Sequence, residues 1–274
     1  MTKTIGMIVP SVDNSFFAHL ASNVEKELAL KEYDTLICSS ENNAEREREY
    51  FKKLVDLGIG GCICVSGLTA LPEDLIPADY PLVWVDRIPE SVRPVPWVAN
   101  DDEEAMEQAT LYLIEKGSRN ILLVPGYSAE TQESPRVKGY KKALLKMGIE
   151  VNEDYILKRG GKKSSEIETA ELVSTVMHKG LKVDGIITSS DRAAFGAMVA
   201  LSKVGFYVPE DVRLISFDNS PYTTMSSPSI TAIDRNPHEL AVKAVELLIS
   251  LIKCQKTEIE NTIEVSLVKR DSTR

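Results

Sequence analysis

Short apolar runs alternate with segments of helical period along the first part of the chain. The helical segments span residues 17–30 and 44–57, and Gly58 ends the second one. Nearly unbroken apolar strands separated by amphipathic helices are typical of a parallel sheet that helices cover on both faces. The runs that predict strands are TIGMIVP (4–10), DTLICS (34–39), GGCICVSG (60–67) and PLVWVD (81–86).

The same alternation begins again past residue 100. Helical periods are expected over 101–116, 137–147, 165–178 and 191–204. The strand-like runs between them are NILLVPG (120–126), YILKRG (155–160), DGIITSS (184–190) and RLISFD (213–218). Two successive halves of similar content predict an α/β fold with two doubly wound, Rossmann-like lobes, each built on a parallel sheet.

The last part of the chain is too short for a third core. It offers the strand SITAID (229–234), a helix over 237–253 and the strand NTIEVSLVKR (261–270), which we expect to join the existing lobes. The chain then crosses between the lobes three times, near Asn100, Asp234 and Lys256. The predicted lobes are 1–100 with 235–256, and 101–234 with 257–274, hinged around a cleft.

Composition and charge narrow the class of protein. Apolar residues make up 43% and charged residues 27%, and no run approaches the ~18–20 apolar residues of a bilayer span. The apolar run at 4–9 is too short for a secretory signal, so we expect a cytoplasmic protein without membrane association. The formal charge is −9. A basic face for nucleic acid is not evident, and the basic cluster at 158–163 is interpreted as a solvated loop.

The cysteines favour buried thiols over a metal site. They lie mostly in apolar runs, and Cys62 and Cys64 share one face of their predicted strand. A second cluster of Cys or His that would complete a metal site is not found in the sequence. This usage suits a reducing compartment, and we expect neither a metal nor another cofactor.

Polar and aromatic residues follow the predicted strands. In open parallel sheets, ligands bind beyond the carboxyl ends of the strands. Carboxylates accept hydrogen bonds from sugar hydroxyls, arginines donate to them, and aromatic rings cover the apolar face of a sugar. The candidate ligand-binding residues are Ser11, Asn14, Phe16, Phe17, Asp86, Arg87, Arg136, Ser190, Asp191, Phe217, Asp218 and Arg235.

Several candidates have a second interpretation. Phe16 and Phe17 are adjacent behind a polar turn, and we predict that one packs into its lobe while the other covers a ligand. Asp191 is equally well explained as a helix N-cap, and Asn14, with Asp13, as a turn former. Asp86 and Arg87 are alternatively a surface ion pair. Arg136 lies at the start of a predicted helix, where the helix dipole disfavours a positive charge. We therefore expect another reason for an arginine at this position.

Common catalytic motifs are absent from the sequence. It contains no G-x-G-x-x-G, no phosphate-binding loop, no G-x-S-x-G and no H-E-x-x-H. A pair of carboxylates, Asp86 and Asp218, remains an acid–base alternative. Binding without turnover explains the same residues more simply, so we do not expect an enzyme.

Several segments, in order, resemble the effector-binding region of the LacI/GalR family of bacterial transcription regulators. They are IGMIVPSVDNSFFAHL, EREREYFKKL, VDRIP, RVKGYKKAL, VPEDVRLISFDNSP and VSLVKRDST. The resemblance implies a periplasmic-binding-protein-like type I fold with three crossovers, a homodimer and a small-molecule effector. It also implies that DNA is bound only through an N-terminal helix-turn-helix, which this sequence lacks. A solute-binding protein of a sugar transporter is the alternative.

The resemblance carries residue roles with it. Asn14, Phe16, Asp86, Arg87, Arg136 and Asp218 match positions that commonly contact effector in the family. Ser190 stands where the family often has Asn, and Arg235 where Gln is common. Because Arg235 adds positive charge, one hypothesis is an anionic substituent on a sugar effector. The alternative is that Arg235 pairs with a nearby acid and does not meet the ligand.

Overall fold

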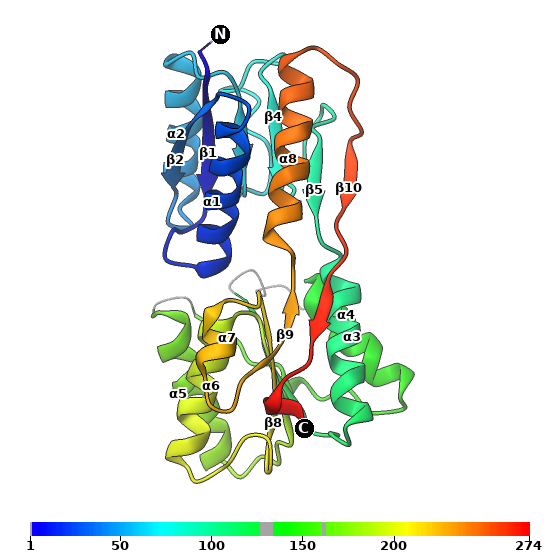
Figure 1. Cartoon of the computed structure of the whole chain (residues 1–274). Helices are drawn as coiled ribbons and strands as arrows, with labels where there is room; N and C mark the ends of the chain where they lie inside the picture. Colours follow the sequence, from blue (N-terminus) through cyan, green and yellow to red (C-terminus); the bar gives the residue numbers. More distant parts are fainter. Residues whose placement is uncertain (1, 127–133, 161–162) are drawn as a thin grey trace. The chain divides into compact units, whose positions relative to one another are not determined.

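The chain folds into two compact α/β units, shown in the computed structural model of Figure 1, which describes residues 2–126, 134–160 and 163–274. The first unit comprises Met1–Asn100 and Asn236–Glu264, and the second comprises Asp101–Arg235 and Val265–Arg274. Each unit is a sheet of mainly parallel strands with helices on both faces. The α/β class with two doubly wound units is therefore confirmed.

The first unit is built on a six-stranded parallel sheet in the order β10-β5-β4-β3-β1-β2. Ile5 and Met7 of β1 pack with α1 and α8 on one face, whereas Ile8 packs with α2 on the other. Burial on both faces explains why the strand is an unbroken apolar run. The elements are β1 (Thr4–Val9), α1 (Ser15–Ala29), β2 (Asp34–Ser39), α2 (Ala44–Asp56), β3 (Cys62–Cys64), β4 (Leu82–Val85), β5 (Trp97–Ala99), α8 (Pro237–Ile252) and β10 (Glu260–Thr262).

The second unit is built on a five-stranded sheet in the order β11-β9-β8-β7-β6. Ile187 and Ile215 face the core under α3 and α4, and Ile186 and Leu214 face the core under α5 and α6. The elements are α3 (Asp102–Glu115), β6 (Ile121–Val124), α4 (Pro135–Lys146), η2 (Glu153–Tyr155), α5 (Ser165–His178), β7 (Gly185–Thr188), α6 (Asp191–Lys203), β8 (Arg213–Phe217), α7 (Pro221–Met225), β9 (Thr231–Asp234), β11 (Ser266–Val268) and η3 (Asp271–Thr273).

Side-chain caps fix where the helices begin. The side chains of Asn14, Asn43, Asp101, Ser134 and Ser190 accept hydrogen bonds from the first backbone amides of α1, α2, α3, α4 and α6. These caps satisfy donors that have no partner inside the helix. The caps of α1, α2 and α6 lie shortly after the ends of β1, β2 and β7, so these helices begin near the carboxyl ends of those strands.

The run at 261–270, expected as one strand, is two strands in different sheets. β10 pairs parallel with β5 in the first unit, and β11 pairs antiparallel with β9 in the second. Residues 257–264 therefore lie in the first unit, and the prediction that they belong to the second lobe is wrong. Arg235, expected in the first lobe, lies in the second unit. Periodicity along one run does not report which sheet edge the run meets.

Two further elements differ from expectation. The run at 155–160 makes only an isolated bridge, between Ile156 and Leu123, and follows the short turn η2. The strand β5 was not predicted, because its three residues are too few for a period to be seen. The part of the basic cluster at 161–162 lies outside the described residues.

The four cysteines all lie in the first unit as free thiols. Cys38, Cys62 and Cys64 are free and buried, while Cys254 is exposed. Burial raises the pKa of the Cys62 and Cys64 thiols well above the ordinary value, so these thiols stay protonated. Across the described part of the chain, none of the helices has the length and apolar character needed to cross a bilayer.

Candidate functional site

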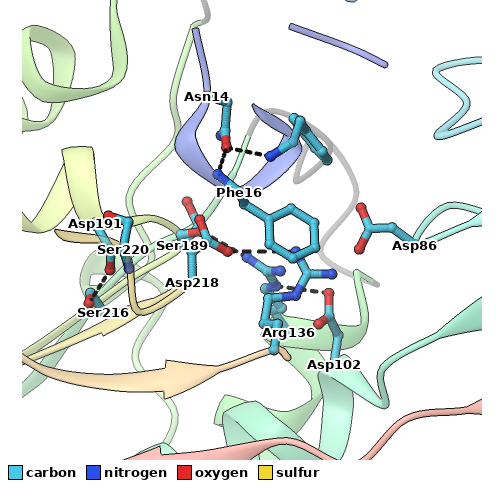
Figure 2. Close-up of polar contacts among 12 residues, drawn as sticks. Asn14, Phe16, Asp86, Asp102, Arg136, Ser189, Asp191, Ser216, Asp218 and Ser220 are labelled. Carbon is cyan, nitrogen blue, oxygen red and sulfur yellow. Dashed lines mark hydrogen bonds and ion pairs between the residues drawn. The ribbon is translucent and has the colours of Figure 1, made fainter. Parts of the chain in front are cut away.

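Asn14 and the two phenylalanines form the loop and first turn after β1. The Oδ1 atom of Asn14 accepts hydrogen bonds from the amides of Phe16 (2.9 Å) and Phe17 (3.4 Å), so Asn14 is the N-cap of α1 (Figure 2). In the same loop, Ser11 Oγ accepts a hydrogen bond from the amide of Asp13 at 3.2 Å. Asn14 thus does more than form a turn, because it sets where α1 begins.

Both phenylalanines belong to the apolar core of the first unit. Phe16 and Phe17 are buried, and their rings meet edge to face with centroids 5.4 Å apart. The prediction that only one packs into its lobe is wrong, because α1 begins at Ser15. Both rings then lie on the helix, about 100° apart, within its broad apolar stripe. Contact of either ring with a ligand stays a prediction.

The turn after β4 carries Asp86 and Arg87. Asp86 has a backbone φ of 67°, in the left-handed region that non-glycine residues seldom adopt. Arg87 Nε lies 4.0 Å from Asp86 Oδ2, and the guanidinium lies over the Phe17 ring, 5.7 Å from its centroid. The ion pair between Asp86 and Arg87, one of the two interpretations offered from the sequence, is present. Arg87 also lies over the ring of Phe17, which follows β1.

A buried carboxylate that was not predicted supports the loop after β3. Glu47 reaches from α2, where its Oε1 accepts a hydrogen bond from Ser66 Oγ and its Oε2 accepts one from the Gly67 amide at 2.7 Å. The thiol of Cys64 lies 3.8 Å from Oε1. Burial raises the pKa of Glu47, and these hydrogen bonds act in the opposite direction. Glu47 lies within an acidic and basic helix segment, and nothing in its spacing marks it as buried.

In the second unit, Arg136 is held in one position by three groups. Its Nε donates to Asp102 Oδ2 and its Nη1 to the Ser189 carbonyl, both at 2.9 Å (Figure 2). The guanidinium also lies 4.3 Å from the centroid of the Phe217 ring, close enough for a cation–π contact. Asp102, which was not among the predicted site residues, explains how a cation is tolerated at the start of α4. Phe217 lies in the core under α3 and α4.

Asp191 is a buried acid inside α6, and its interpretation as an N-cap is wrong. The cap is Ser190, whose Oγ accepts a hydrogen bond from the Ala193 amide. Asp191 Oδ1 accepts from Ser216 Oγ, and Oδ2 accepts from the Ser220 amide, both at 2.5 Å (Figure 2). Burial raises the pKa of Asp191, and these bonds act in the opposite direction. Asp191 therefore ties α6 to the turn that follows β8.

Asp218 and Arg235 form a close pair at the ends of β8 and β9. Arg235 Nη1 lies 3.6 Å from Asp218 Oδ1, and both side chains are buried. Burial and the nearby Asp191 carboxylate raise the pKa of Asp218, while Arg136 lowers it. Burial lowers the pKa of Arg235 to about 9, so the guanidinium remains charged at neutral pH. Asp218 is thus the nearby acid that the alternative interpretation of Arg235 requires.

These side chains suit binding of a hydroxylated molecule. In each unit, carboxylates, guanidinium groups and aromatic rings lie just beyond the carboxyl ends of parallel strands. Within the described ranges, no group of three or more His, Cys, Asp or Glu side chains is placed to hold a metal ion. Two doubly wound units with such residues define the class of type I periplasmic-binding-protein-like ligand-binding proteins.

Comparison with known proteins gives the family. The family described as periplasmic binding proteins and sugar binding domain of LacI family matches residues 2–271. The chain belongs to this family. A curated relative, the HTH-type transcriptional repressor PurR of Vibrio parahaemolyticus, is 30% identical over 263 residues, which cover 94% of this chain and 77% of that protein.

Solved structures of transcription regulators are similar along the whole chain. The transcription regulator CcpA of Lactococcus lactis has a TM-score of 0.87 at 26% identity. A periplasmic binding protein/LacI transcriptional regulator from Alkaliphilus metalliredigens, complexed with D-xylulofuranose, has a TM-score of 0.85 at 27% identity. In both comparisons, all of this chain and all of the other chain are covered. The relatives favour a LacI-type regulator over a transport protein, and repressors are not enzymes.

Proposed function

We propose that this chain is the effector-sensing domain of a LacI/GalR-type transcription regulator and binds a small sugar. The observation that supports this best is the group in the second unit formed by Arg136, Asp218 and Arg235. Arg136 is fixed over Phe217, and Asp218 and Arg235 lie together at the strand ends. This group combines acceptors, donors and a ring beside each other, as recognition of sugar hydroxyls requires.

We propose a neutral sugar rather than an anionic one. Arg136 lies against Asp102 at 2.9 Å, and Arg235 lies 3.6 Å from Asp218. Each arginine is thus matched by a carboxylate, which removes the excess positive charge on which the anionic hypothesis depended. A hydroxyl both donates and accepts, so it fits an alternation of guanidinium and carboxylate groups. The sugar bound to the Alkaliphilus relative, D-xylulofuranose, supports the same class.

Effector binding controls transcription through the rest of the regulator. A ligand with a higher affinity for one conformation shifts the population toward it. In the intact cytoplasmic protein, we propose that this shift changes DNA binding by the helix-turn-helix heads of a homodimer, which couples two distinct sites.

The test is calorimetric binding to a panel of sugars and their phosphates. D-Xylulose, D-ribose, D-xylose and D-glucose are each compared with the corresponding phosphate, after a thermal-shift screen. We expect a neutral sugar to bind, and the substitutions Arg136→Ala and Asp218→Asn to weaken binding at least about 30-fold, because each removes a charged hydrogen-bonding group.

Lys138→Ala is the matched control, because Lys138 lies on the same helix as Arg136 and is exposed. Its affinity should equal that of the unmodified protein. Binding of the phosphates alone would contradict the neutral class. Equal affinity in all three variants would refute the assignment of the residues.

A further inference from the structure

The turn between β8 and α7 has a strained backbone. Asp218 has a φ of 99° and Asn219 a φ of 55°, so two successive non-glycine residues lie in the left-handed region. A residue in this region is strained, and the conformation persists only where the surroundings hold it. Glycine would adopt this conformation without the steric cost. The protein therefore keeps these side chains in spite of the strain.

Both ends of the Asn219 amide are engaged. Its Oδ1 accepts a hydrogen bond from Arg270 Nη2 at 2.6 Å, and its Nδ2 donates to Asp234 Oδ2 at 2.9 Å. A charged donor at one end and a charged acceptor at the other fix the orientation of the amide. The side chain of Asn219 is thus clamped between β9 and the segment after β11.

Arg270 is itself anchored by its neighbours. Its Nη1 donates to the Ile230 carbonyl at 2.8 Å, and its backbone amide donates to Thr231 Oγ1 at 2.8 Å. The guanidinium is therefore bonded to the start of β9 with one nitrogen and to the Asn219 side chain with another. Arg270 lies 51 positions from Asn219 in the sequence, so this clamp depends on the tertiary fold.

The other side of the turn is held by α6 and by the sheet. The Ser220 amide donates to Asp191 Oδ2 at 2.5 Å, and the Asp218 amide donates to the Ile233 carbonyl at 2.9 Å. The backbone on either side of Asn219 is consequently fixed as well. With the turn held in this way, the direction of the Asp218 side chain is set by groups other than a ligand.

We propose that Arg270 and Asn219 are positioning residues that orient the Asp218 carboxylate for the effector without touching it. This inference rests on the proposed function, in which Asp218 binds the sugar. The free-energy cost of ordering the Asp218 side chain is then met when the protein folds, and not when the effector binds. Preorganisation of this kind increases affinity. Loss of either residue should reduce effector affinity even though Asp218 is still present.

The two residues should act as one unit. We expect Arg270→Met and Asn219→Ala each to weaken binding about tenfold, because a hydrogen bond to a charged group is lost. The double variant should be little weaker than either single one, since both changes release the same turn. Asn219→Gly should lose less affinity than Asn219→Ala, because glycine accepts a positive φ without strain.

The experiment measures two quantities on the full chain. Calorimetry with D-xylulose, D-ribose and D-xylose gives the affinity. Hydrogen exchange of the Ser220 amide, which is bonded to Asp191, reports the order of the turn without any sugar. Exchange should be faster in Arg270→Met and Asn219→Ala than in the unmodified protein. Lys269→Met is the control, because it removes an adjacent cation that lies over the Tyr112 ring instead.

The outcomes separate the two proposals. Additive losses of affinity, or equal losses in the glycine and alanine variants, would overturn the positioning role. Unchanged exchange at Ser220 would overturn the clamp itself, whether or not a sugar binds. A third outcome is that the unmodified protein binds no sugar while exchange becomes faster in the variants. The clamp would then be supported, whereas the sugar-sensing function and the role of the clamp in effector binding would both be refuted.

Discussion

Glu47 illustrates how burial changes the chemistry of one residue. Its carboxylate is fully buried below the loop after β3 and accepts hydrogen bonds from Ser66 and Gly67. Burial raises its pKa above the ordinary value of 4.5. The folded protein therefore binds the proton more tightly than the unfolded chain does. By linkage, the free energy of unfolding increases as the pH falls through the folded pKa toward 4.5.

Replacing Glu47 with Gln should remove this dependence on pH. Relative to Glu47→Gln, the unmodified protein should gain stability as the pH is lowered from neutral toward 4.5. Urea unfolding at a series of pH values measures the difference. The control is Glu49→Gln. Glu49 lies on the exposed side of the same helix, and its Oε2 atom is 3.6 Å from Lys53 Nζ. A constant difference would mean that the hydrogen bonds to Glu47 offset the effect of burial.

Tyr140 provides a second test at the level of one atom. Its hydroxyl is buried, donates to the Ile121 carbonyl at 2.7 Å, and has a pKa raised by burial. Tyr140→Phe leaves that carbonyl without its donor and should lower the free energy of unfolding by about 1–3 kcal/mol. Tyr207→Phe, at a side chain that is 70% exposed, should change it very little. Equal effects in both variants would contradict a buried hydrogen bond at Tyr140.

The sequence indicated individual residues better than their partners. Arg136 and Asp218 were selected because each follows a strand or opens a helix. Asp102 was missed, because it lies 34 positions from Arg136 and its contact depends on how α3 packs on α4. Asp191 was selected as a ligand contact or a helix N-cap. Its hydrogen bonds to Ser216 and Ser220 arise only when β8 lies beside α6. Partners that are distant in sequence leave no local pattern.

At the level of elements, two glycines let neighbouring helices of the second unit approach closely. A Cβ atom at Gly139 of α4 would lie 2.1 Å from the Glu103 carbonyl oxygen of α3. A Cβ atom at Gly196 of α6 would lie 2.2 Å from the Glu166 carbonyl oxygen of α5. In each case the obstacle is backbone, which cannot rotate away. The pairs α3–α4 and α5–α6, on opposite faces of the sheet, thus both pack closely through a glycine.

Gly139→Ala should therefore destabilise the protein. Alanine is the better helix former by about 1 kcal/mol, but separating α3 from α4 costs more, typically 1–3 kcal/mol and at times beyond that range. Thermal or urea unfolding gives the difference. Lys138→Ala, at the exposed neighbouring position, should be close to neutral. A gain in stability at Gly139 would show that the two helices are free to shift apart.

Elements with long periods were predicted well, and several short strands were not. β1 and α1 follow from an unbroken apolar run and a helical stripe. β5, β10 and β11 have three residues each, fewer than the 4–8 on which a strand pattern is judged. Which strands they pair with is set by the tertiary fold, and a local pattern does not carry that information.

At the scale of the whole molecule, each unit has its own core and its own spectroscopic properties. The two tryptophans, Trp84 and Trp97, both lie in the first unit. Ser272, in the second unit, is buried; its hydroxyl donates to the Leu214 carbonyl and accepts from the Thr231 amide. Fluorescence consequently reports unfolding of the first unit, whereas circular dichroism reports both.

Ser272→Ala should separate the two transitions. Loss of its hydrogen bonds should weaken the second unit by about 1–3 kcal/mol, so the midpoint by circular dichroism should fall while the fluorescence midpoint stays near its original value. Ser266→Ala, at an exposed position in β11, is the control. Equal shifts of both midpoints would mean that the two units unfold as a single cooperative body.

The order of segments along the chain also has a consequence for biosynthesis. Helix α8 and strand β10, which complete the first unit, follow residues 101–235 of the second. During translation, the strands β1–β5 leave the ribosome long before α8 is available to cover their apolar face. Residues 101–235 emerge as one continuous piece. The first unit thus stays incomplete until most of the second has been synthesised. Its uncovered sheet is the surface that a nascent-chain chaperone would need to protect.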